Sequence, residues 1–269
     1  MSVNSNNAEV VLVTGSSSGI GAACCERLSR NRRVWGASRT GTDQEQWSYV
    51  KMDVTDEDSV EAAVDSIVRR DGRIDAVVHC AGLSLSGPVE ETTRDETLRQ
   101  FETNYFGTVR ILRAVLPVMR RQGCGRIVVI GSIAGLIGLP YAGHYSATKF
   151  AVDGLMEALR HEVLPFGIYV SVVHPGDFNT RAGDYRIYRK NAGSEYVSAF
   201  EQAAAFYAAS EKRARHPDVV ARKIEAILAR RRPRLRYVVG TPLEVLGVWA
   251  KRVLPADLFA YFFRRFYLP

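Results

Sequence analysis

Residues 10–21 read VVLVTGSSSGIG, an apolar run that leads into a turn containing three glycines. The run 10–14 is apolar or β-branched at every position, which predicts a strand buried on both faces of a sheet. Gly15, Gly19 and Gly21 follow, and a helix is predicted over 19–30. Glycines in such a turn let the backbone approach a pyrophosphate, whose charge the free N–H groups of a helix start can bind. This order predicts a dinucleotide site, with a plain tight turn as the alternative.

The rest of the chain alternates short β-branched runs with segments of helical length. Strands are predicted at 10–14, 33–38, 49–53, 74–79, 126–132, 168–174 and 235–240, and helices at 19–30, 56–71, about 95–121, 145–164 and 217–231. This alternation predicts an α/β, doubly wound Rossmann fold, in which a seven-stranded parallel sheet carries helices on both faces. We expect residues 1–8 to be a disordered N-terminal tail and residues 9–269 to form one domain.

Two segments lie outside this alternation. Residues 177–216 contain no predicted strand, are rich in Tyr and Phe, and follow directly after a strand, so we expect an aromatic lid. Residues 242–269 form a C-terminal helical extension that ends in DLFAYFFRRFYLP, which is too short and too charged to cross a bilayer. The extension would cover the active site, pack on a partner subunit or lie on a membrane surface. We favour packing within the protein.

Composition limits the partners and the compartment. The cysteines follow no metal-ligand or disulfide spacing, and the polar start does not resemble a signal peptide, so we expect a reducing cytoplasm and no metal. Residues 1–180 hold 18 Lys and Arg against 21 Asp and Glu, whereas residues 181–269 hold 18 against 8. The densest basic piece, RRRPRLR at 230–236, would attract phosphate or anionic lipid, or simply be a solvated helix end. No nucleic-acid motif accompanies it.

The end of the second predicted strand indicates which dinucleotide would bind. An acidic residue at this place would bind the 2′-hydroxyl of the adenosine ribose, but the chain has Ser38 and Arg39. A hydroxyl and a guanidinium suit a 2′-phosphate, which favours NADP(H) over NAD(H). Asp53 and Val54 follow the third predicted strand, where they would contact the adenine.

A tyrosine and a lysine stand four residues apart in HYSATKFA (144–151). Residues four apart share one face of a helix, so the phenol of Tyr145 and the ammonium of Lys149 would lie side by side. The pair is either an accident of the surface or an acid–base pair. Ser132 ends a predicted strand thirteen residues before Tyr145, and Asn104 lies within the long preceding helix.

Together these four residues resemble the tetrad of the short-chain dehydrogenase/reductase family. The resemblance covers nearly the whole chain through TGSSSGIG at 14–21, CAG at 80–82, the tetrad and PGDFNT at 175–180. It implies that Asn104, Ser132, Tyr145 and Lys149 are catalytic. It also implies a set of residues that contact the cofactor: Gly15, Ser17, Ser18, Gly19, Ile20, Gly21, Ser38, Arg39, Asp53, Val54, Cys80, Ala81, Gly82, Tyr145, Lys149, Pro175, Gly176 and Thr180.

The chemistry of carbonyl reduction explains these residue types. Tyr145 can donate a proton efficiently only if its pKa, ordinarily about 10, comes nearer to neutrality. The charges of Lys149 and of the oxidised nicotinamide favour the phenolate, and a shift of about three units corresponds to roughly 4 kcal/mol. Ser132 would hold the substrate oxygen against Tyr145. By resemblance, Lys149 also binds the nicotinamide ribose, Asn104 positions a water, and Thr180 contacts the carboxamide.

One position departs from the family pattern. Cys80 stands where the family commonly has asparagine before AG, so a side-chain hydrogen bond that helps to hold the cofactor loop is expected to be missing. His79, His144 and His174 adjoin the motifs, and we expect them to be packing or surface residues.

The branch of the family is indicated by three further stretches, GLSLSGPVEE, NYFGTVRILRAVLPVM and ALRHEVLPFGIYVSVVHPG. They look most like 17β-hydroxysteroid and retinol dehydrogenases, which implies a ketone, aldehyde or alcohol on a bulky apolar substrate. A β-ketoacyl thioester reductase and a non-catalytic dinucleotide sensor are the alternatives. The resemblance also implies a homodimer or homotetramer, built on the helices that hold Asn104 and Tyr145.

Overall fold

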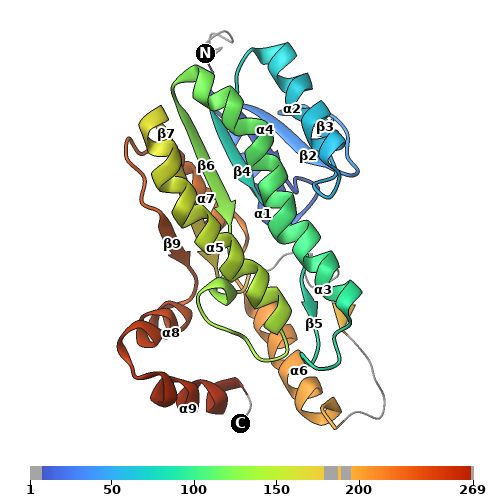
Figure 1. Cartoon of the computed structure of the whole chain (residues 1–269), viewed down its shortest axis with the longest axis vertical. Helices are drawn as coiled ribbons and strands as arrows, with labels where there is room; N and C mark the ends of the chain where they lie inside the picture. Colours follow the sequence, from blue (N-terminus) through green and yellow to red (C-terminus); the bar gives the residue numbers. More distant parts are fainter. Residues whose placement is uncertain (1–7, 179–186, 189–194, 268–269) are drawn as a thin grey trace.

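The computed structural model describes residues 8–178, 187–188 and 195–267. Seven strands form one parallel sheet in the order β3-β2-β1-β4-β6-β7-β9 (Figure 1). Their bounds are β1 Val10–Thr14, β2 Arg33–Ser38, β3 Ser48–Lys51, β4 Ala76–His79, β6 Gly125–Ile130, β7 Ile168–Pro175 and β9 Arg236–Val239. The predicted doubly wound fold is therefore confirmed. Strand order reverses between β1 and β4, the position at which such sheets place a dinucleotide.

Side chains of the central strands alternate between two apolar layers. Val10 and Leu12 of β1 join the cluster beneath α2, α4 and α5, whereas Val11 and Val13 join the cluster beneath α1 and α7. Figure 1 shows α4 and α5 on one face of the sheet, with α1 and α7 behind it. Every residue of β1 is buried, as the unbroken apolar run predicts.

The helices begin and end largely where the sequence predicts. Their bounds are α1 Gly19–Leu28, α2 Glu57–Asp71, α3 Arg94–Phe101, α4 Gly107–Gln122, α5 Gly143–Val163, α6 Val197–Arg213, α7 Asp218–Leu228, α8 Pro242–Val253 and α9 Ala256–Tyr267, with short 3₁₀ turns at η3 Ile133–Gly135 and η4 Leu164–Phe166. Local signals set several ends. The Asp56 side chain accepts from Ser59 N and caps α2, and Gly72 ends it with φ of 72°.

The long helix predicted at about 95–121 is not regular. Between α3 and α4 it contains a π turn, η2 Glu102–Phe106, which holds Asn104. A π turn inserts one extra residue into the helical ladder and is frequent at functional sites. Hydrophobic spacing does not reveal one inserted residue, which is why the sequence predicted an uninterrupted helix.

Two further differences concern strands. The predicted strand 126–132 ends at Ile130, so Ser132 lies just beyond β6. Residues 177–216, expected to lack strands, include β8 Ile187–Tyr188, which pairs in parallel with β5 Leu85–Ser86. A two-residue strand has too little pattern to be recognised in a sequence. Residues 1–7 of the expected N-terminal tail lie outside the described residues.

The C-terminal extension forms α8 and α9, as expected. Val248 of α8 is buried with Ile133 and Ile137, and Phe259 and Phe263 of α9 pack against the same cluster. The extension thus packs within the protein through its inner face, beside the 3₁₀ turn that follows Ser132. Among the described residues, no helix is both long and apolar enough to span a membrane.

Candidate active site

Tyr145 and Lys149 lie near the start of α5, on one face as predicted. The Lys149 Nζ atom is 5.8 Å from the centroid of the Tyr145 ring. It donates a 2.9 Å hydrogen bond to the carbonyl oxygen of Ile130, the last residue of β6. Lys149 is buried, and this burial lowers the pKa of its ammonium to about 8, against an opposing effect of Cys80. The cation is thus held at the carboxyl end of the sheet.

Asn104 joins this pair to the loop that follows β4. Its Oδ1 accepts from Leu83 N at 2.7 Å, and its Nδ2 donates to Leu83 O at 2.8 Å and to Thr148 Oγ1 at 3.0 Å. A Cβ atom added to Gly82 would lie 3.4 Å from Asn104 Oδ1 and 3.7 Å from Lys149 Nζ. Gly82, Asn104 and Lys149 are therefore neighbours around one open position.

Ser132 is held at both its side chain and its backbone. Its Oγ accepts from Ala134 N at 3.1 Å, so the hydroxyl hydrogen stays available to donate to a substrate oxygen. Its carbonyl oxygen lies 3.0 Å from Nδ1 of His174, a fully buried residue of β7. His174 is thus a packing residue, as expected, and it supports the backbone of Ser132.

A chain of polar contacts continues from His174 to the surface. Its Nε2 lies 3.2 Å from Asp153 Oδ1, and Asp153 accepts bonds of 3.1, 3.0 and 2.7 Å from Arg236 of β9. Burial alone raises the pKa of Asp153, but the bonds from His174 and Arg236 hold that pKa below its usual value. Sequence reasoning missed Asp153 and Arg236. The one signal in the sequence for Asp153 was its position four residues after Lys149, which places both on one face of α5.

His79 is buried at the end of β4 and stays neutral. Burial, followed by the charge of Lys149, lowers the pKa of His79 to about 3. Its Nδ1 lies 2.7 Å from Thr14 Oγ1. Thr14 Oγ1 also accepts from Cys80 N at 3.2 Å and from Ala81 N at 3.3 Å, so its own hydrogen is directed at His79. One threonine therefore holds the start of the loop after β4.

Cys80, the departure from the family pattern, packs inward. It contacts the apolar cluster that contains Cys24 and Cys25 of α1. A hydrogen bond with Cys80, together with burial, raises the pKa of Cys24. The Thr14 hydroxyl thus holds the loop by its backbone, at the place where an asparagine side-chain bond was expected to be missing.

The glycine-rich turn after β1 fits a pyrophosphate. Gly15 and Gly19 have φ of 68° and 57°, in the left-handed region that favours glycine. A Cβ atom on Gly15 would lie 2.8 Å from Ala81 N, and one on Gly21 would overlap the Gly15 carbonyl. The side chain of Ser18 makes no capping bond to the first turn of α1, whose N–H groups stay free for an anion. Ser17 and Ile20 lie in the same turn.

The ends of β2 and β3 carry the predicted adenosine contacts. Ser38 Oγ donates to Thr40 O at 2.6 Å, and Arg39 is exposed beside it. Burial alone raises the pKa of Asp53, but hydrogen bonds from Thr55 and the charge of Arg39 bring that pKa below its usual value. Val54, also expected at the adenine, has its side chain packed against Gly107 of α4.

The loop after β7 is fixed by a residue that sequence reasoning missed. Pro175 ends β7, and Gly176 N donates to Val239 O at 2.9 Å. Glu244 of α8 accepts from Asp177 N at 2.8 Å, and a Cβ atom on Gly176 would overlap its carboxylate. Thr180 lies outside the described residues.

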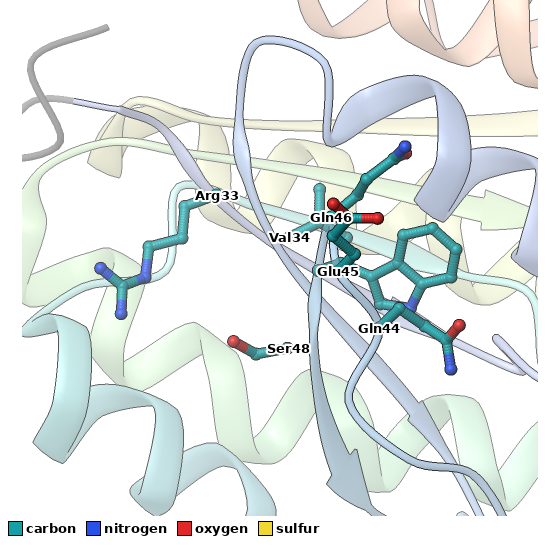
Figure 2. Close-up of a pocket in the computed structure, with 7 residues that line it drawn as sticks. Arg33, Val34, Gln44, Glu45, Gln46 and Ser48 are labelled. Atoms are coloured by element: carbon teal, nitrogen blue, oxygen red, sulfur yellow. The ribbon is translucent and has the colours of Figure 1, made fainter. Parts of the chain in front are cut away.

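A surface pocket at the amino end of β2 is lined by Arg33, Val34 and 44–48, and it contains no residue of this candidate site (Figure 2).

The family profile described as short chain dehydrogenase matches residues 9–188. The chain belongs to the short-chain dehydrogenase family. As a member, it is an oxidoreductase that acts on CH–OH groups with NAD(H) or NADP(H) as cofactor. No cluster of His, Cys, Asp or Glu suited to a metal ion occurs among the described residues.

Known members are similar over most of this short-chain dehydrogenase. A 3-ketodihydrosphingosine reductase of Bacteroides thetaiotaomicron is 39% identical over 265 residues, which cover 96% of this chain and 98% of that protein. Human 17-beta-hydroxysteroid dehydrogenase type 1 is 39% identical over 189 residues, 64% of this chain and 57% of that protein. The crystal structure of a short-chain dehydrogenase from Streptomyces avermitilis superposes with a TM-score of 0.83, at 30% identity and 95% coverage of both chains.

The buried Lys149 of this short-chain dehydrogenase should make stability depend on pH. Burial lowers the pKa of Lys149 from 10.5 to about 8, so the charged ammonium carries a free-energy penalty in the folded state. That penalty is complete below pH 8 and disappears as the pH rises toward 10.5. Lys149→Met has no ammonium to bury and therefore no such penalty. The free energy of unfolding of the variant, relative to that of wild type, should fall by about 3 kcal/mol as the pH rises from 8 to 10.5.

Denaturant unfolding at several pH values would measure this difference. Lys51→Met provides the control, because it removes the same charge from a side chain that is exposed at the end of β3. A difference for Lys149→Met that stays constant with pH would show that burial of the ammonium carries no such penalty.

Proposed function

We propose that this protein is an NADPH-dependent reductase of a ketone on a bulky apolar substrate, with Tyr145 as the proton donor. One observation carries the proposal: Tyr145, Lys149 and Asn104 converge with the loop 80–83 at the carboxyl ends of the strands. Ser132 follows β6 at the same edge of the sheet. Aldehyde reduction and the reverse oxidation of an alcohol would use the same groups.

Each side chain has one task in this reaction. The nicotinamide, when bound, supplies the hydride. Tyr145 gives its phenolic proton to the carbonyl oxygen, and the nearby Lys149 cation favours the phenolate that remains. Ser132 donates its free hydroxyl hydrogen to the same oxygen and fixes its position. Asn104 uses both hydrogens of its amide to hold Leu83 and Thr148, so a water in a proton relay would donate to an oxygen of Asn104 and would not accept from its Nδ2.

The relatives support a long-chain substrate. The 3-ketodihydrosphingosine reductase is similar across almost the full chain, whereas the steroid dehydrogenase matches only about two thirds of it. We therefore propose 3-ketodihydrosphingosine, or a ketone with a similar long alkyl chain, as the substrate. The expected lid, which includes α6, supplies apolar side chains beside the site. Phe200 packs against Tyr141 at 5.5 Å between ring centroids, and Tyr207 OH donates to Pro140 O at 2.9 Å.

Removal of the Tyr145 hydroxyl tests the reaction. Tyr145→Phe should lower turnover of 3-ketodihydrosphingosine by about a hundredfold or more, because general acid catalysis supplies at least that factor. NADPH binding, followed by fluorescence, should stay close to the wild-type level. Absorbance at the nicotinamide band would measure turnover on this ketone, a steroid ketone, a short aliphatic ketone and an acetoacetyl thioester. Turnover of the thioester alone would favour the β-ketoacyl alternative, and NADPH binding without any turnover would favour a sensor.

We propose NADP(H) rather than NAD(H), because Arg39 is exposed at the end of β2 and a guanidinium can bind a 2′-phosphate through two charge-assisted bonds. Arg39→Asp should lower the NADPH preference by about tenfold to a hundredfold, as expected for the loss of such bonds. Titration of both cofactors would measure the change. Arg30→Asp alters the same charge on an exposed residue after α1 and should leave the preference unaltered. Equal selectivity in all three proteins would refute the assignment.

We also propose a homodimer built on α3, η2 and α5. Leu98, Phe106 and Phe150 are each exposed by more than 40%, and exposed large apolar side chains on neighbouring elements are typical of an interaction site. Phe106→Glu should therefore shift the sedimentation coefficient toward that of a monomer. A wild-type monomer at micromolar concentration would contradict this proposal.

The compartment that we propose is the reducing cytoplasm. All four cysteines, Cys24, Cys25, Cys80 and Cys124, are free thiols, and two of them are buried in the core. Free thiols in these positions are typical of a reducing environment.

A further inference from the structure

We propose that the outer face of α8 and α9 docks this protein on an anionic lipid surface. This C-terminal apolar face consists of Leu243, Leu246, Trp249, Val253, Leu258, Tyr261 and Phe262, whose exposed fractions run from 44% to 74%. Single exposed apolar residues are ordinary, but seven on two consecutive helices form a patch of the kind that marks an interaction site.

Sequence spacing places these side chains on one side of each helix. Leu246, Trp249 and Val253 of α8 follow an i, i+3, i+7 pattern, and Leu258, Tyr261 and Phe262 of α9 follow i, i+3, i+4. The opposite sides are occupied, since Val248, Phe259 and Phe263 pack inward. Each helix thus has two apolar sides, one packed on the protein and one facing outward.

The face has a fixed position beside the active site. The inner sides of both helices rest on Ile133 and Ile137, directly after Ser132, and Glu244 ties α8 to the backbone of Asp177. Figure 1 shows α8 and α9 at the end of the molecule where α6 and the start of α5 also lie. A surface that covered the outer face would therefore lie close to the residues proposed to bind substrate.

Charge favours a lipid surface over a second copy of the chain. Residues 242–267 hold four Lys or Arg against two Asp or Glu. Glu244 is engaged by the backbone N–H groups of Asp177 and Thr241, while Arg252, Arg264 and Arg265 are exposed. Two such faces packed together would bring these cations into contact, whereas anionic headgroups complement them.

The aromatic residues add a second argument for a lipid interface. The Arg252 guanidinium lies over the Trp249 ring at 5.6 Å from its centroid. Trp and Tyr rings prefer the boundary between acyl chains and headgroups, where an adjacent arginine reaches the phosphates. Trp249 with Arg252, and Tyr261 with Arg264 and Arg265, provide this combination on both helices.

Vesicle flotation tests the proposal without any turnover, so its failure is distinguishable from failure of the proposed reaction. The full-length protein would be mixed with vesicles of phosphatidylcholine and phosphatidylglycerol in equal parts, and with vesicles of phosphatidylcholine alone. We expect binding to the anionic vesicles to be at least about tenfold stronger, because each basic residue near such a surface adds to the free energy of binding. Raised salt should release the protein.

A matched pair of variants locates the contact. Trp249→Glu combined with Phe262→Glu should reduce binding to anionic vesicles by at least about tenfold. Leu164→Glu combined with Phe166→Glu changes two exposed apolar residues after the far end of α5 and should leave binding unaltered. Thermal unfolding and NADPH titration would show that both double variants are folded.

Three results would overturn the proposal. The first is wild-type protein that floats equally with both kinds of vesicle or with neither. The second is a Trp249→Glu, Phe262→Glu variant that retains its binding. The third is a fall in the sedimentation coefficient of that variant in the absence of vesicles, which would make the face an interface between copies of this chain.

Discussion

The close contact between the turn after β1 and the loop after β4 is the constraint on which the site depends. The two strands pair in parallel with Thr14 opposite His79, so Gly15 meets Ala81 at a distance that leaves no room for a Cβ atom. The Thr14 hydroxyl then binds both backbone N–H groups of residues 80 and 81. Neither segment can shift without the other, and the glycine-rich turn and the loop beside Lys149 are therefore one rigid unit.

Buried hydrogen bonds connect this unit to the side chains that we propose as catalytic. Asn104 joins Leu83 to Thr148, and Lys149 is anchored on Ile130. Buried charge opposes folding, as the lowered pKa of Lys149 indicates, and the fold tolerates this because the sheet supplies a large apolar core. Stability is reduced at the place where the proposed reaction would need a cation beside a phenol.

The sequence was sufficient for features that depend on neighbouring residues. Apolar runs located all seven strands of the main sheet, and the glycines located the tight turn after β1, because both depend on the backbone of a few consecutive residues. The π turn at Asn104, the pairing of β5 with β8 and the Asp153–Arg236 bond were missed. Asp153 and Arg236 are 83 residues apart, so only the folded sheet brings them together. Glu244 was missed for the same reason.

The loop after β7 connects the two parts of the molecule that differ most from the regular alternation. Asp177 receives a hydrogen bond from Ser210 of α6 and gives its backbone N–H to Glu244 of α8. Phe178 forms a bridge with Arg215, which in turn donates to the carbonyl of Gly240. The segment expected to cover substrate and the helices proposed to contact lipid thus share one attachment, at the carboxyl end of β7. Any displacement of α8 by a surface would act on this loop directly, through the Glu244 carboxylate.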